Sequence, residues 1–104
     1  MVDEILTAAG VQHRETRYVK PPTGTYAVWM EDVDADGSDD AEAMVYTHAA
    51  TIELYSSTPD APSEVAIEAA IEAKGLRWTK QARYWIQEEQ LYQVIYEFNY
   101  YTKG

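Results

Sequence analysis

Apolar residues recur at helical spacing at the start of the chain. They are Val2, Ile5, Leu6 and Ala9. Asp3 and Glu4 fall in the first turn, where the helix dipole favours acids, and Gly10 suits the left-handed residue that ends many helices. This pattern predicts a helix over residues 2–9.

After Gly10 the residues become typical of strands. Residues 12–19 favour extended structure and predict an edge strand, which ends where Pro21 and Pro22 break the chain. The β-branched and aromatic run over residues 25–33 predicts a second strand. A third strand is indicated by residues that alternate onto one face: Met44, Tyr46, His48, Ala50, Ile52 and Leu54.

Residues 31–43 contain acids and no base. The seven acids are Glu31, Asp32, Asp34, Asp36, Asp39, Asp40 and Glu42. Asp36 and Gly37 form a typical turn pair. We therefore predict a loop here, the mobile and negatively charged tip of a hairpin between the second and third strands.

Residues 64–74 are strong helix formers that end at Gly75, and they predict a second helix. Its expected core stripe is Ile67, Ala70 and Ile71. One turn apart on another face lie Glu64, Glu68 and Glu72, which repel one another. These acids are expected to face solvent or a basic neighbour.

Two further aromatic segments, residues 77–86 and 90–101, predict a second hairpin. In the last strand the continuous apolar face is Tyr92, Val94, Tyr96, Phe98 and Tyr100. The other face carries Leu91, Gln93, Ile95, Glu97 and Asn99. This second set is half polar and half apolar, as subunit interfaces often are, although covering a small sheet would explain the many aromatic residues equally well.

The order of elements predicts an α+β fold, an antiparallel β-sheet of four to five strands with two helices packed on one face. With 46% hydrophobic and 25% charged residues, the chain is too apolar for a disordered acidic protein, and its 104 residues suit one domain, residues 1–104. No stretch approaches the ~20 apolar residues that cross a bilayer, and the N-terminus is acidic, so we expect a soluble, unprocessed protein without membrane contact.

The chain has no cysteine, which excludes disulfides, thiolate zinc sites and cysteine nucleophiles. Its net charge of -10 disfavours tight binding to nucleic acid or anionic lipid and favours a basic or neutral protein partner. Three bases, Arg77, Lys80 and Arg83, alternate with aromatic residues, but they are few for nucleic-acid binding. They are expected to pair with acids of an adjacent subunit, for example Glu64, Glu68 or Glu72.

The aspartates Asp32, Asp34 and Asp36, followed by Gly37, copy the first half of an EF-hand calcium loop. The closing position of that loop is Ala43, and strands flank it where helices are required, so a solvated turn is expected. His13 and His48 have no partner at ligand spacing and are expected to be structural. No serine has a nucleophile-elbow context, and residues 22–25 lack the lysine of a phosphate loop. We therefore expect no catalysis, metal or cofactor.

Four segments carry a resemblance to a known family: residues 22–29 (PTGTYAVW), 78–81 (WTKQ), 83–86 (RYWI) and 91–98 (LYQVIYEF). They resemble the tail-completion or tail-terminator proteins that join head to tail in long-tailed bacteriophages and prophages. The resemblance spans nearly the whole chain. It implies a virion protein of the tail or neck, present in the bacterial host cytoplasm before assembly.

The resemblance further implies a hexameric homo-oligomeric ring that caps the tail tube and docks the head connector. DNA would pass through its channel without specific binding, because acidic loops face the channel. The residues expected at the contacts are Asp32, Asp34, Asp36, Asp39, Asp40, Leu91, Gln93, Ile95 and Glu97. Alternatives are another small minor tail or connector protein, an acidic inhibitor that mimics DNA, and a calcium-binding module.

Overall fold

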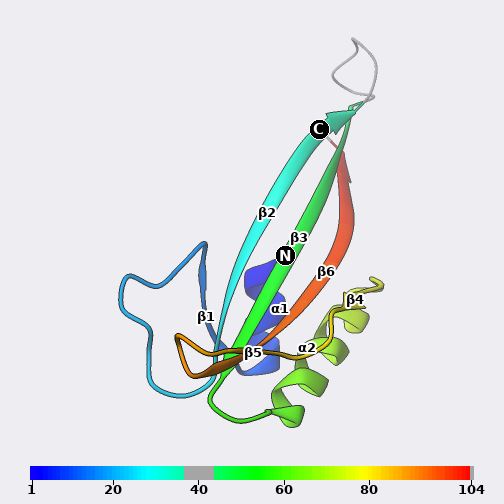
Figure 1. Cartoon of the computed structure of the whole chain (residues 1–104). Coiled ribbons are helices and arrows are strands. Elements are labelled where there is room, and N and C mark those ends of the chain that lie inside the picture. The colour runs from blue at the N-terminus through cyan, green and yellow to red at the C-terminus, as the bar shows by residue number, and fades with distance from the viewer. Residues whose placement is uncertain (37–43, 104) are drawn as a thin grey trace.

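The computed structural model describes residues 1–36 and 44–103 of the chain. Its elements, drawn in Figure 1, are α1 (Val2–Ala9), β1 (Gln12–Glu15), β2 (Tyr26–Asp36), β3 (Val45–Ser56), α2 (Ala61–Ala73), β4 (Thr79–Lys80), β5 (Tyr84–Ile86) and β6 (Leu91–Lys103). The first helix has its predicted bounds, and Gly10 ends it at a positive φ of 74°. The second helix begins earlier than predicted because Asp60 caps it and Pro62 suits its first turn.

One mostly antiparallel sheet holds all six described strands in the order β1-β2-β3-β6-β4, with β5 also paired to β6. The α+β class is confirmed, although the strand number exceeds the predicted four to five. The segment predicted as one strand over residues 77–86 forms two short strands, β4 and β5, which both pair with β6. β1 runs parallel to β2, since the connection between them returns the chain to the same end of the sheet.

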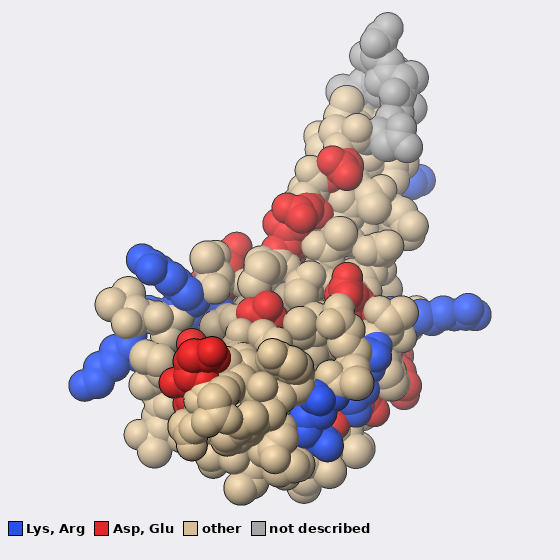
Figure 2. All heavy atoms as spheres, in the orientation of Figure 1, with Lys and Arg blue, Asp and Glu red and all other residues tan. Residues whose placement is uncertain are grey.

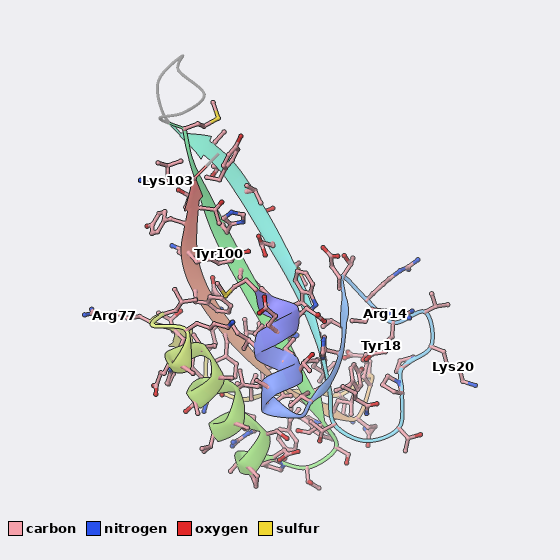
Figure 3. The ribbon with its side chains drawn as sticks, turned by 180° about the vertical axis from the view of Figure 1, so that it is seen from behind. Arg14, Tyr18, Lys20, Arg77, Tyr100 and Lys103 are labelled. Atoms are coloured by element: carbon pink, nitrogen blue, oxygen red, sulfur yellow. The ribbon has the colours of Figure 1, made fainter. Side chains whose placement is uncertain are left out.

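Both helices lie on the same face of the sheet, as the view from behind in Figure 3 shows. The predicted helix stripes supply Ile5, Leu6, Ile67 and Ile71, which are fully buried. Against them pack the predicted apolar faces of β3 and β6, including Ile52, Leu54, Val94 and Tyr96. The core therefore lies between the helices and the central strands β3 and β6.

The acidic segment is corrected by the structure. Glu31, Asp32, Asp34 and Asp36 belong to β2 and not to a loop, because β2 stays paired with β3 from Tyr26 to Asp36. Strand pairing satisfies the backbone, the Asp32 and Asp34 side chains remain in water, and Glu31 is hydrogen-bonded to His48 and Tyr100, so these charges do not prevent extension. The predicted hairpin between β2 and β3 is confirmed. Its predicted tip, with Asp39 and Asp40, lies outside the described residues.

β2, β3 and β6 continue past the helices as a three-stranded projection, which we call the arm (Figure 1). It consists of residues 32–36, 45–49 and 99–103, which are in register with one another. β1 and β4 pair with the body of the sheet and stop before the arm begins. The arm therefore exposes sheet that helices and edge strands cover elsewhere.

Candidate assembly interface

The structure brings the predicted contact residues that it describes onto one face of the sheet, the face that turns away from the helices. Asp32 lies opposite Ala49, which lies opposite Asn99. Asn99 shares its face of β6 with four of the predicted contacts, which are Leu91, Gln93, Ile95 and Glu97. Asp34 occupies the next position of this face along β2. Figure 2 shows this side of the molecule, with acidic residues following the arm.

Tyrosines cover the lower part of this face. The Tyr26 ring stacks on Tyr55 at 5.2 Å between centroids and meets the edge of Tyr18 at 5.4 Å. Gln93 donates a hydrogen bond to the Tyr55 hydroxyl, which donates to Glu53. Burial raises the pKa of Tyr55 to about 12, so its hydroxyl stays protonated at neutral pH. This row makes a rigid, amphipathic surface of the kind enriched in interfaces.

The outer edge of β6 is open in the arm. β4 pairs with β6 only at Glu97 and Tyr96. The backbone N–H of Gln81 donates one further hydrogen bond to the Ile95 carbonyl. Beyond Glu97, no strand of the described chain pairs with this edge of β6. Backbone groups alternate in direction along a strand, so those of Asn99, Tyr101 and Lys103 point outward like those of Ile95.

An open groove of about 880 Å³ follows this edge. It lies between β6 and the chain that leaves α2, and its lining includes Met1, Lys74, Arg77, Trp78, Glu97 and Tyr101. Tyr101 is 67% exposed. The edge thus combines free backbone groups, an exposed aromatic ring and basic side chains.

The outer edge of β2 is open in the same way. β1 pairs with β2 up to Trp29, whose carbonyl accepts a hydrogen bond from the Thr16 backbone at 2.7 Å. By the same alternation, the backbone groups of Glu31, Val33 and Ala35 point outward. No described strand covers them. Within the described chain, the arm therefore has two uncovered edges, one on each side.

A polar cluster on the helix-facing side braces the arm. Glu31 accepts hydrogen bonds from Tyr100 at 2.7 Å and from His48 at 2.5 Å. The other ring nitrogen of His48 bonds to Thr102, and its ring stacks on Tyr100 at 4.3 Å between centroids. Burial and the bond to Glu31 raise the pKa of Tyr100. The cluster joins β2, β3 and β6 to one another.

His13 has a comparable structural position, between the Val11 carbonyl and Asp3. Both histidines therefore make hydrogen bonds within the fold, as predicted.

A second polar cluster ties α2 to the chain after it. Glu64 is only 4% exposed and accepts from Lys80 at 2.8 Å and from Arg83 at 2.7 Å. Lys80 also reaches Glu68, which accepts from the Tyr96 hydroxyl at 2.6 Å. Burial opposes the charge on Glu64, but the hydrogen bonds from the two bases outweigh it and lower its pKa.

The prediction that these bases pair with a neighbouring subunit is therefore wrong for Lys80 and Arg83. The segment after α2 folds back over the helix and places both bases against acids of their own chain. Glu72 also has a partner within the chain, since it accepts a hydrogen bond from the Trp78 indole. Arg77 projects away from the body in Figure 3.

The geometry does not favour a calcium loop. Asp32, Asp34 and Asp36 belong to a paired strand, which cannot wrap its ligands around a cation. Among the described residues no cluster of three histidines or acids is placed to hold a metal ion. No helix in the described chain is long and apolar enough to cross a membrane.

Comparison with known proteins identifies a solved structure with a similar fold. No family model and no curated protein matches the chain. Among solved structures it is similar to a chain of the structure titled "Virion of native gene transfer agent (GTA) particle", with a TM-score of 0.66 and 16% identity. The match covers 96% of this chain and 84% of that one. Nearly the whole architecture is therefore shared with a component of that particle.

Proposed function

We propose that the chain is a structural protein of a phage-like particle, and within it a ring-forming tail-terminator or tail-completion subunit at the head-to-tail junction. The observation that carries the proposal is the shared fold, which covers 96% of the chain and occurs in a virion. The resemblance of the sequence to tail-completion proteins points in the same direction.

The exposed surfaces suit a protein whose function is to bind other protein chains. The arm offers two uncovered strand edges, and the face away from the helices carries the tyrosine row. Most described carboxylates are exposed or engaged in the two polar clusters. The half-buried Glu53 accepts from Tyr55, and Asp60 accepts from Thr25 and Ser63, so a pair of acids aimed into a shared cleft is not among the described residues. We therefore assign no catalysis and no cofactor.

In this proposal copies join in a ring, a hexamer by analogy with the tail-completion proteins, between tail tube and head connector. The net charge of -10 keeps DNA in the channel from sticking, because like charges repel. Asp32 and Asp34 are exposed on the arm and contribute to this negative field.

Particles purified from producing cells provide the test. Peptide mass spectrometry is expected to find the chain in full particles and in isolated tails, and gold-labelled antibody is expected to mark the neck. Label along the tail or at its far end would indicate another minor tail protein. Absence of the chain from purified particles would overturn the proposal.

An acidic DNA mimic is the second candidate, because Asp32 and Asp34 follow one another on the same exposed face of β2. Such a row can imitate a line of phosphates. This candidate predicts a soluble complex with a DNA-binding enzyme that added duplex DNA displaces. A chain found only in particles would exclude it.

A further inference from the structure

The two open edges of the arm are complementary in charge and equal in the number of free backbone positions. Three residues of β2, Glu31, Val33 and Ala35, direct their backbone groups outward on one side. Three residues of β6 do so on the other side, and these are Asn99, Tyr101 and Lys103. Unpaired strand edges of this kind are templates for adding another strand.

Charge distinguishes the edges. The uncovered part of β2, residues 30–36, contains Glu31, Asp32, Asp34 and Asp36 and no base. The uncovered part of β6, residues 99–103, contains Lys103 and no acid.

The groove beside the β6 edge adds Lys74 and Arg77, although Lys74 also pairs with Glu4 and the rim includes Glu97. Figure 3 shows Arg77 and Lys103 on the same side of the molecule, with Arg14 and Lys20 on the opposite side, beside β1.

The resemblance to tail-completion proteins implies that the sheets of neighbouring subunits join in the ring, and we infer that they join where the β6 edge of one copy receives the β2 edge of a second copy. The inference rests on the proposed function and names the surfaces through which the ring would form. Pairing β2 with β2 would set the acidic edges of two copies against each other, whereas pairing β6 with β2 brings Lys103 against those acids. The occupant that fits the edge is therefore a second copy of this chain.

Strand direction agrees with a closed assembly. β2 and β6 are each antiparallel to β3, so both run from the body toward the tip of the arm. Two copies in the same orientation therefore meet as a parallel pair. Head-to-tail contacts between different surfaces generate rings when the rotation closes, whereas a contact of one edge with itself stops at a dimer.

Cysteine cross-linking tests the pairing directly, because the natural chain contains no cysteine. Asp34→Cys and Tyr101→Cys variants place a thiol on the same sheet face of the two edges. Under mild oxidation with copper phenanthroline, the inference predicts a disulfide-linked dimer in a mixture of the two variants and little in either alone. Efficient dimers in either single variant would show self-pairing and overturn it.

A backbone substitution supplies an independent test. Tyr101→Pro removes one outward N–H and no internal strand bond, whereas Tyr101→Thr changes the side chain and keeps that donor. The proline variant is expected to lose about tenfold or more in association constant by sedimentation velocity, relative to the threonine variant. Equal association of the two folded variants would contradict the inference.

If the proline variant does not fold, exchanging the charges of the two edges tests the pairing. Asp34→Lys and Lys103→Glu are each expected to weaken association, and mixing the two variants is expected to restore it. Failure of these tests while the wild-type chain still assembles would refute the edge pairing and leave the proposed function intact. A wild-type chain that remains monomeric at every concentration would overturn the inference as well.

Discussion

Replacing Glu64 by glutamine tests the cluster that holds the segment after α2. The carboxylate is 4% exposed and accepts three hydrogen bonds, two from Arg83 at 2.7 and 3.2 Å and one from Lys80 with its Nζ at 2.8 Å. Breaking a fully buried ion pair costs about 3–5 kcal/mol. Here Lys80 keeps Glu68, and both bases are about a third exposed. The expected loss is therefore lower, about 2 kcal/mol.

Urea unfolding followed by tryptophan fluorescence measures this loss, and a loss of this size corresponds to a Tm roughly 10 °C lower. Glu72→Gln is the matched control on the same helix, because its exposed carboxylate accepts only from the Trp78 indole. It is expected to change the free energy of unfolding by under about 0.5 kcal/mol. A Glu64→Gln variant as stable as this control would refute the reasoning.

The pH dependence of the difference has a definite sign. The folded pKa of Glu64 is lower than its ordinary value of 4.5, so the unfolded chain takes up the proton first as the pH falls. The stabilisation is complete well above pH 4.5 and is lost as the pH falls through the folded pKa. The two proteins should therefore converge in stability under acid, and a difference that grows below pH 4.5 would contradict the assignment.

Three further predictions concern the fold and the excluded chemistry. Asp60→Ala should destabilise by about 1 kcal/mol in urea, because its carboxylate caps α2 through the Ser63 backbone and accepts from Thr25; no change would refute the cap. Ile67→Ala should cost about 3 kcal/mol, since its side chain is fully buried, and a loss under about 1 kcal/mol would show that the core is misplaced. Calorimetric titration with calcium from about 10⁻⁶ to 10⁻³ M should give no binding heat, whereas saturable heat would restore the calcium module.

The elements that could be predicted are those with a strong period or an end signal. Gly10 marked the end of α1, and the alternation from Met44 onward defined the buried face of β3. The two faces of β6 were also predicted, because Val94, Tyr96 and Phe98 alternate with polar residues. In each case a local pattern reflects the side of the element that meets the core.

The errors arose where tertiary contacts override local composition. The acids of residues 31–36 were interpreted as a loop, yet pairing with β3 holds them extended. Nothing local to Lys80 or Arg83 shows that the chain folds back onto α2 and Glu64. The parallel pairing of β1 depends likewise on the path of a connection that the pattern of residues does not encode.

The candidate interface could be predicted only in part. Alternation along β6 identified Leu91, Gln93, Ile95 and Glu97 as one face, which the structure leaves uncovered by helices. The open strand edges were missed, because an edge is defined by where its neighbour stops. The feature that points to them is the shortness of the strand at Thr79 and Lys80 beside a strand of 13 residues.

Native mass spectrometry of the wild-type chain over a series of concentrations tests most directly the central claim that this protein acts by contact between its own copies. The account predicts that, as concentration rises, a single closed oligomer replaces the 11.8 kDa monomer, with six copies as the expected number. A chain that remains monomeric throughout, including after addition of the tail-tube protein of the same particle, would contradict it.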